Sequence, residues 1–215
     1  IYPRDCPQPI KEEYLLTGPL EPTNRPYALA KISGIEMCGS YNRQYGTQYL
    51  AVMPTNLYGP GDNYELKNSH VIPALIRKFH EAKVNQLPSV EIWGTGAPRR
   101  EFLFVDDLAK ACVHLMNLDS QSYEQLINQT FPIINVGSGE DISIKDLASL
   151  IKEVVGYEGD IMFNPSYPDG TPRKLLDVSV MKKINLCSQI SLRAGLKNTY
   201  SEFTKSQHSR KELSV

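Results

Sequence analysis

The residues best suited to chemistry are Tyr27 and Lys31, which lie four positions apart in the stretch NRPYALAK. In a helix this spacing puts both side chains on one face, about 6 Å apart along the axis. A nearby ammonium group favours the phenolate and lowers the phenol pKa from its ordinary value of about 10. Such a phenol can exchange a proton with a substrate oxygen. Both residue types are common, so an ordinary surface pair on a helix would give the same pattern.

Two further polar residues stand where α/β proteins place functional groups. His70 follows Asn68-Ser69 at the predicted start of a helix, and its imidazole, with an unperturbed pKa of about 6.5, suits an acid near neutral pH. Asn56 follows an apolar run, at the strand end where α/β folds bind ligands. A capping histidine and a turn asparagine would explain the same two residues without any function.

Three residues later in the chain are candidates for binding a nucleotide diphosphate. Trp93 is the only tryptophan. Arg100 follows a glycine-rich turn, and the planar fork of its guanidinium group suits a diphosphate. Lys174 adds a second cation beside a loop rich in proline and glycine. Taken alone, each residue also fits a core position or a solvated surface.

Composition excludes several classes of function. Among 215 residues, 23 Lys and Arg balance 24 Asp and Glu, so no net field attracts nucleic acid. No apolar run has the length of a membrane span. The cysteines are scattered, without Cys-x-x-Cys pairing, which argues against a metal site. We therefore predict a cytoplasmic protein that binds neither nucleic acid, membrane nor metal.

The element pattern predicts an α/β fold with a largely parallel sheet, because strands alternate with helices. Predicted helices span residues 24–44, 70–82, 106–116, 143–155, 178–184 and 190–204, and predicted strands span 49–53, 90–94, 100–105, 131–136 and a stretch near 161. Residues 1–23, 54–61, 118–130 and 165–172 are predicted as loops. Asn24, Ser69 and Ser143 are predicted N-caps.

No Gly-x-Gly-x-x-Gly turn is found among the 14 glycines, although α/β folds that bind dinucleotides usually carry one. The sequence also begins without methionine, at Ile1-Tyr2-Pro3. We therefore expect a fragment whose first βαβ units are missing.

Several motifs carry a resemblance to a known family. The Tyr27–Lys31 pair, MPTNLYGP (53–60), REFLFVDD (100–107) and NVGSG (135–139) resemble the extended short-chain dehydrogenase/reductases that act on nucleotide sugars. NSHVIPAL (68–75) and PDGTPRKLLD (168–177) are similar to the GDP-L-fucose synthases within that family. The likeness extends to about residue 205.

The resemblance implies the C-terminal part of a Rossmann-type fold with a smaller substrate-binding lobe. Residues 1–64 would be the remaining part of the Rossmann-type domain, including the Tyr-x-x-x-Lys helix. Residues 65–205 would mainly bind the GDP-sugar, with elements near 100–136 returning to the first domain. Residues 206–215 would form a polar tail.

The implied reaction is NADPH-dependent 3,5-epimerisation and 4-reduction of GDP-4-keto-6-deoxy-D-mannose to GDP-L-fucose. Tyr27 would donate a proton to the C4 keto oxygen, Lys31 would lower the Tyr27 pKa and bind the nicotinamide ribose, and His70 would be the epimerisation acid. The implied cofactor contacts are Tyr27, Lys31, Pro54, Thr55, Asn56, Leu57 and His70. The implied substrate contacts are Asn56, Lys78, Trp93, Arg100 and Lys174.

The sequence departs from the family in one position and leaves competing hypotheses open. Lys78 follows Arg77 where the family carries two arginines, so it keeps the charge but loses the bidentate fork.

Most of the NADP(H) site would precede Ile1, so we expect the chain alone to be inactive. The family is typically homodimeric. The competing hypotheses are another nucleotide-sugar reductase, a 4-epimerase, and a truncated fragment that binds GDP-sugar without turnover.

Overall fold

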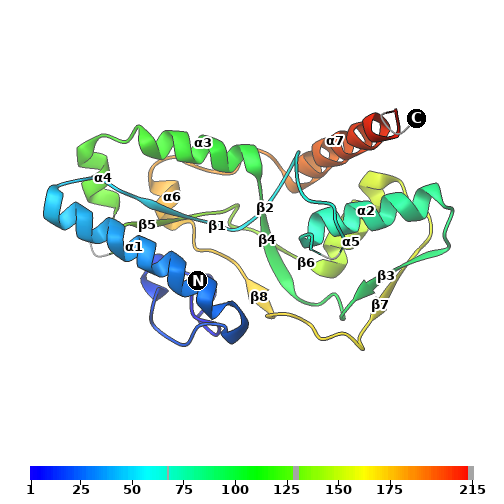
Figure 1. Cartoon of the computed structure of the whole chain (residues 1–215), viewed down its shortest axis with the longest axis horizontal. Helices are drawn as coiled ribbons and strands as arrows, with labels where there is room; N and C mark the ends of the chain where they lie inside the picture. The colour runs from blue at the N-terminus through cyan, green and yellow to red at the C-terminus, as the bar shows by residue number, and fades with distance from the viewer. Residues whose placement is uncertain (67, 128–130, 213–215) are drawn as a thin grey trace. The chain divides into compact units, whose positions relative to one another are not determined.

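The computed structural model describes residues 1–66, 68–127 and 131–212, and Figure 1 shows its helices and strands. The chain divides into two compact units. Unit 1 comprises Ile1–Thr55, Asp107–Glu140 and Lys174–Ser188, and unit 2 comprises Asn56–Asp106, Asp141–Arg173 and the described residues of Gln189–Val215. Each unit is therefore assembled from three separate stretches of sequence. The cofactor and substrate roles predicted for residues 1–64 and 65–205 stay predictions.

Unit 1 is built around helix α1 and a pair of parallel strands, β1 and β5. Pro26 stands in the first turn of α1, where its missing N–H costs no helical hydrogen bond, and Gly46 ends the helix with φ 65°. Ile32 and Ile35 on α1 pack against Leu15 and Ile133 in a small core. The elements are η1 (Glu12–Tyr14), η2 (Pro22–Asn24), α1 (Arg25–Tyr45), β1 (Ala51–Pro54), α3 (Val105–Met116), α4 (Ser120–Leu126), β5 (Ile133–Val136) and α6 (Ser179–Lys183).

A buried asparagine fastens the start of the chain to unit 1. Asn135 is 0% exposed. Its Nδ2 donates to the Ile10 carbonyl at 2.9 Å, and its Oδ1 accepts from the Tyr2 hydroxyl at 2.6 Å. The Glu12 carboxylate accepts the Asn135 backbone N–H at 2.9 Å. Residues 1–23, predicted as a surface loop, are thus held by buried polar contacts that no periodicity signals.

Unit 2 holds the larger core. Ile76 and Phe79 of α2, Leu147 and Ile151 of α5, and Leu196 of α7 are each 0% exposed and belong to one cluster. Burial of these apolar side chains is the main stabilising term of the unit. The elements are β2 (Asn56–Tyr58), α2 (Val71–Val84), β3 (Ser89–Trp93), β4 (Arg99–Phe104), β6 (Asp141–Ser143), α5 (Ile144–Val155), β7 (Asp160–Asn164) and α7 (Leu192–Glu212). Strand β8 (Arg173–Lys174) begins in this unit and pairs with β4.

The predicted parallel character is confirmed, although the described strands form three separate sheets. The pairs β1–β5, β2–β4 and β3–β7 are parallel, and β4–β6 is antiparallel. The predicted capping by Ser143 is also confirmed, because its side chain accepts the Asp146 N–H. Asn24 makes no side-chain cap bond, and His70 rather than Ser69 occupies the N-cap position of α2.

Three predicted loops or tails contain regular structure. Strand β2 lies inside the predicted loop 54–61, and α4 lies inside the predicted linker 118–130, whose last three residues are outside the described part. Helix α7 runs to Glu212, into the predicted tail 206–215, of which residues 213–215 are not described. Two short elements, β6 and β8, were not predicted, because two or three residues give no periodic signal.

Asp141 links three strands of unit 2. Its side chain is 5% exposed and lies between two arginines. Arg99 Nε donates to one carboxylate oxygen at 2.8 Å, and Arg173 Nε donates to the other. Burial alone would raise the pKa of Asp141, but the hydrogen bonds and charges of Arg173 and Arg99 outweigh it and hold the pKa below its ordinary value. The ionised carboxylate therefore joins β4, β6 and β8.

Replacing this carboxylate should destabilise the chain. Asp141→Asn removes the charge from two arginines, and we expect a loss of about 1–2 kcal/mol in the free energy of unfolding, measured with urea. Glu153→Gln is the matched control, because Glu153 pairs with Arg193 on the open surface and should matter less. Since the folded pKa is lowered, the contribution of Asp141 is present above its unfolded pKa of about 3.9 and is lost as pH falls through the folded value. Equal losses for both variants at pH 7 would contradict this role.

Candidate functional site

The structure places Tyr27 and Lys31 side by side on α1, as the spacing predicts. Lys31 Nζ lies 5.5 Å from the centroid of the Tyr27 ring. Both side chains are exposed, so a substrate oxygen and a cofactor ribose can reach them. Their geometry fits the predicted proton transfer, and their catalytic role stays a prediction.

The predicted cofactor stretch 54–57 is divided between the two units. Pro54 and Thr55 belong to unit 1, where the Thr55 N–H donates to the Val136 carbonyl at 3.0 Å at the end of β1. Asn56 and Leu57 belong to unit 2, and Asn56 Nδ2 donates to the Glu101 carbonyl at 2.8 Å. In this structure the Asn56 amide nitrogen therefore holds β2 against β4.

Unit 2 contains a cavity of about 710 Å³, which we call the Trp93 cavity. A volume of this order suits a ligand the size of a nucleotide. It brings together Lys78, Trp93 and Arg100, three of the five predicted substrate contacts. Its lining residues are Leu66, Ser69, Val71, Ala74, Leu75, Lys78, Ile92, Trp93, Gly96, Pro98, Arg100, Ile144, Pro168, Asp169 and Gly170.

The two cations of the Trp93 cavity are held by backbone carbonyls rather than by acids. Lys78 Nζ donates to the Glu91 carbonyl at 3.1 Å, and Arg100 Nη1 donates to the Arg99 carbonyl at 2.7 Å. Within the described residues, no ion pair within 4.0 Å involves either cation. Burial lowers the pKa of both Lys78 and Arg100. The charge of Glu91 partly opposes this effect at Lys78, whereas burial is the single cause at Arg100. Partly desolvated cations outside close ion pairs favour a phosphate ligand.

The loop 165–172 forms one wall of this cavity and is fixed to the β3–β4 turn. The Asp169 carboxylate accepts the Thr95 N–H at 2.9 Å and the Thr95 hydroxyl at 2.6 Å. Gly94, at φ 82°, allows this approach, because a Cβ there would collide with Asp169. Trp93 stacks on Tyr167 at 4.4 Å between ring centroids. No sequence pattern signals these contacts, since the partners lie more than 70 positions apart.

Of the predicted site residues, only Lys78, Trp93 and Arg100 line the Trp93 cavity, and His70 and Lys174 are among those that do not. His70 is exposed at the N-cap of α2, between the lining residues Ser69 and Val71. Lys174 is exposed on β8 and is assigned to unit 1. The Trp93 cavity therefore gives no support to the roles predicted for His70 and Lys174.

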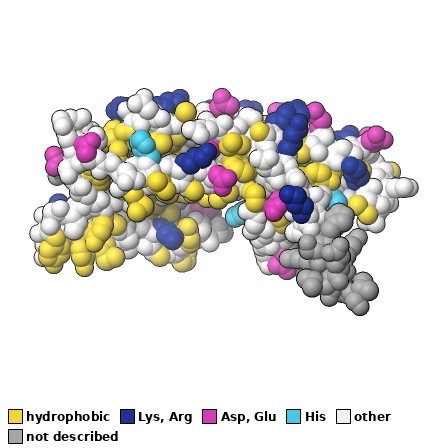
Figure 2. Space-filling model, turned by 90° about the horizontal axis from the view of Figure 1, so that it is seen from above, with side chains coloured by type: hydrophobic (Ala, Val, Ile, Leu, Met, Phe, Trp, Pro, Cys, Tyr) yellow, Lys and Arg dark blue, Asp and Glu magenta, His cyan; other side chains and the backbone are white. Residues whose placement is uncertain are grey.

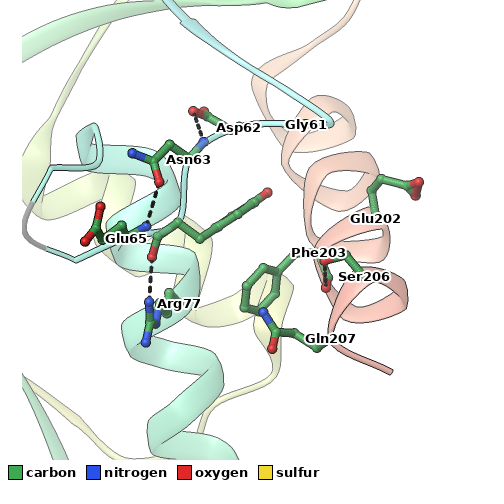
Figure 3. Close-up of a pocket in the computed structure, with 10 residues that line it drawn as sticks. Gly61, Asp62, Asn63, Glu65, Arg77, Glu202, Phe203, Ser206 and Gln207 are labelled. Carbon is green, nitrogen blue, oxygen red and sulfur yellow. Dashed lines mark hydrogen bonds between the residues drawn. The ribbon is translucent and has the colours of Figure 1, made fainter. Parts of the chain in front are cut away.

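A second cavity of unit 2, about 500 Å³ in volume, has the opposite electrostatic character. Figure 3 shows the loop 61–65 on one side of it and α7 on the other. Asp62, Glu65 and Glu202 line it, and Arg77, which lines it as well, pairs with Glu81 outside it. None of the predicted site residues lines it, and its acidic lining is unsuited to a diphosphate.

The surface agrees with the balanced composition. On the face shown in Figure 2, basic and acidic side chains are interspersed rather than separated into fields. Among the described helices, none combines the length and apolar character needed to cross a bilayer. The described residues also contain no group of three or more His, Cys, Asp or Glu side chains arranged to hold a metal ion.

Comparisons with known proteins show the family to which this chain belongs. Residues 1–137 match the NAD dependent epimerase/dehydratase family. GDP-L-fucose synthase of Escherichia coli K12 is 54% identical over 210 residues, which cover 96% of this chain and 64% of that protein. GDP-L-fucose synthase 1 of Arabidopsis thaliana is 52% identical, with 95% of this chain and 61% of that protein covered. The chain thus spans less than two thirds of these relatives.

Solved structures show the same fold. A GDP-L-fucose synthetase from Naegleria fowleri bound to NADP superposes with a TM-score of 0.84 and 27% identity, covering 96% of this chain and 64% of that one. A GDP-mannoheptose C4 reductase from Campylobacter jejuni with NADP bound gives a TM-score of 0.82 and 36% identity, covering 94% of this chain and 67% of that one. These likenesses confirm the α/β, Rossmann-like fold expected from the sequence.

Proposed function

This chain belongs to the NAD dependent epimerase/dehydratase family, and from that premise we propose that it is part of an enzyme that converts GDP-4-keto-6-deoxy-D-mannose to GDP-L-fucose with NADPH. The observation that carries the proposal is the Trp93 cavity. It combines an aromatic ring with two cations that form no ion pair within 4.0 Å among the described residues, although the charge of Glu91 also acts on Lys78. The curated relatives that are about half identical are named GDP-L-fucose synthases.

In this proposal the Trp93 cavity binds the nucleotide end of the substrate. The indole of Trp93 offers a flat surface to the base, and Arg100 and Lys78 attract the diphosphate. Lys78 provides a point charge rather than a bidentate fork. Lys174 of β8, which does not line the cavity, remains a proposed substrate contact.

The reduction is assigned to the Tyr27–Lys31 pair. NADPH, when bound, supplies a hydride for C4 of the sugar. The exposed Tyr27 hydroxyl supplies the proton that the C4 oxygen needs, and the ammonium group of Lys31 stabilises the phenolate that remains. Lys31 would also hold the nicotinamide ribose, and Pro54, Thr55, Asn56, Leu57 and His70 would complete the cofactor contacts that this chain contributes. Two solved relatives contain NADP, which supports this choice of cofactor.

The epimerisation is assigned to His70. C3 and C5 both lie next to the C4 ketone, so their protons are acidic, and inversion requires a proton donor on the face opposite the base. The His70 side chain is exposed, and an imidazole is the side chain best suited to donate a proton near neutral pH.

A C4 reductase without epimerase activity is the second candidate function. The observation in its favour is the likeness to the Campylobacter jejuni GDP-mannoheptose C4 reductase, whose name refers to reduction alone. The hypotheses of a 4-epimerase and of a GDP-sugar-binding fragment without turnover also stay open. We further propose that the protein is cytoplasmic and forms a homodimer. The exposed apolar side chains Leu29, Met37 and Tyr41 of α1 support the homodimer.

Removing one hydroxyl should separate binding from reduction. We expect Tyr27→Phe to lower turnover about 100-fold or more while leaving substrate binding nearly unchanged, because proton transfer matters only in the transition state. The assay uses a chimera in which the part of the Escherichia coli relative that this chain does not span completes the protein. Tyr45→Phe, at another exposed tyrosine of α1, is the control. Normal turnover of Tyr27→Phe would contradict the assignment.

The epimerisation can be followed by solvent exchange. In the same chimera, His70→Asn should slow deuterium incorporation at C3 and C5 about 100-fold or more, while direct reduction of the 4-keto sugar persists. His114→Asn, at an exposed histidine of α3, is the control. Unchanged exchange in His70→Asn would make His70 a structural residue, and absence of exchange in the unmodified chimera would favour a simple C4 reductase.

A further inference from the structure

Gly170, in the loop 165–172, lies against the side chain of Arg100, and both residues line the Trp93 cavity. We propose that Gly170 is a positioning residue, whose missing side chain leaves room for the Arg100 guanidinium group to face an anionic ligand in the cavity. This inference rests on the proposed function, because it assumes that the cavity binds the diphosphate of a nucleotide sugar. It adds to that site a residue that has no functional group of its own.

The backbone at Gly170 does not require glycine, but the space around it does. Gly94 and Gly96 have φ values of 82° and 76°, whereas Gly170 is outside the left-handed region, so its backbone would accept alanine. An ideal Cβ on Gly170 would nevertheless lie 3.1 Å from Arg100 Nη2, closer than most Cβ contacts in proteins. Among the described residues, apart from the two chain neighbours of Gly170, this nitrogen is the only atom within 4 Å of such a Cβ.

The guanidinium group has little room to move aside. Arg100 Nη1, on the same group whose Nη2 faces Gly170, donates to the Arg99 carbonyl at 2.7 Å. Because the guanidinium group is planar and rigid, a shift of Nη2 also moves Nη1 and strains this hydrogen bond. Arg99 is held in turn, because it pairs with Ser143 in the register of β4 and β6. A methyl group on residue 170 should therefore displace the fork from its place in the cavity.

The loop is also held from moving away, because it is fixed on both sides of this glycine. Before it, the Asp169 carboxylate accepts the Thr95 N–H at 2.9 Å and the Thr95 hydroxyl at 2.6 Å. After it, the Pro172 carbonyl accepts the Arg99 N–H at 2.8 Å. Both anchors attach the loop to the segment that runs from the β3–β4 turn into β4, which also carries Arg100. The approach of the glycine to the guanidinium group is thus set by short connections.

The orientation of this fork matters for an anion. The N–H donors of a guanidinium group lie in one plane, so binding two phosphate oxygens at once depends on the direction of that plane. Within the described residues, the Arg99 carbonyl is the only acceptor that this group binds, and its other donors are available. Lys78, the other cation of the cavity, is a point charge on a flexible stem and needs no such orientation. Gly170 should therefore act on the contribution of Arg100 and leave that of Lys78.

Two competing explanations give Gly170 no role in positioning. As an ordinary loop glycine it would affect stability alone, because alanine narrows the unfolded ensemble, and ligand affinity would stay unchanged. If alanine shifted the whole loop instead, binding would weaken whether or not Arg100 were present. The explanations therefore differ in whether the effect of Gly170 depends on Arg100, which a double-mutant cycle measures.

The experiment uses the 215-residue chain and calorimetric titration with GDP. The cycle consists of the unmodified chain, Gly170→Ala, Arg100→Ala and the variant that carries both changes. Gly34→Ala is the matched control, because a Cβ on this glycine of α1 would meet nothing within 4 Å among the described residues. Thermal unfolding of each protein is recorded in parallel.

We expect Gly170→Ala to weaken GDP binding about three- to tenfold, and Arg100→Ala to weaken it about tenfold or more. The double variant should bind GDP no more weakly than Arg100→Ala, because the added methyl group then meets no guanidinium group. Gly34→Ala should bind GDP like the unmodified chain.

Unchanged GDP affinity in folded Gly170→Ala would overturn the inference and leave the proposed function standing. An equal loss from Gly170→Ala with and without Arg100 would overturn it as well, because the glycine would then act through the loop. If the folded, unmodified chain does not bind GDP, the assignment of the cavity fails, and the inference with it.

Discussion

The loop that follows β7 depends on two carboxylates for its position. Residues 165–172, all of them described, contain three prolines and one glycine and have no regular strand or helix of their own. Asp169 binds the middle of the loop to Thr95. At the end of the loop, Arg173 pairs with Asp141, which also pairs with Arg99 of β4. These bonds act together with the Trp93–Tyr167 stack and with the bond from the Arg99 N–H to the Pro172 carbonyl at 2.8 Å, and they offset the conformational entropy that a loop loses when it is ordered.

The acidic and basic side chains near the Trp93 cavity have different roles. The acids hold the surrounding segments in place, whereas the cations are available to a ligand. Asp141 and Asp169 are occupied by partners outside the phosphate-binding positions, while Arg100 and Lys78 hydrogen-bond to carbonyls. Carbonyl partners leave a cation's charge unneutralised, whereas a carboxylate would cancel most of it. The second cavity, lined by Asp62, Glu65 and Glu202, shows the opposite case on the same unit. This difference in charged lining residues supports the proposal of an anionic ligand in the Trp93 cavity rather than in the second cavity.

Much of the fold follows from sequence patterns that are local. The predicted bounds of helix α1 lie within one residue of the observed ones at each end, and its start is marked locally by Asn24 and by the proline in its first turn. The capping by Ser143 is predicted by another local pattern, an acidic residue, Asp146, three positions after the serine. Short elements such as β6, and the buried contacts of Asn135 with the first residues of the chain, were missed because they depend on partners distant in sequence.

The candidate site shows the same division. Lys78, Trp93 and Arg100 were identified in advance by their residue types and the family resemblance, and the structure places them in one cavity. Tyr167 and Asp169 were not, because only the fold brings them next to Trp93 and Thr95. The Tyr27–Lys31 pair was predicted from helical spacing, a local rule, and its geometry is confirmed while its chemistry stays a prediction.

The central claim is that a GDP-sugar binds in the Trp93 cavity, and hydrogen–deuterium exchange of the chain with and without GDP tests it most directly. The account predicts slower amide exchange with GDP in residues 71–78, 92–100 and 167–170, with no change along α1, and weaker protection in Arg100→Ala at the same GDP concentration. Protection confined to the acidic cavity of loop 61–65 and α7, or no protection at saturating GDP, would contradict it.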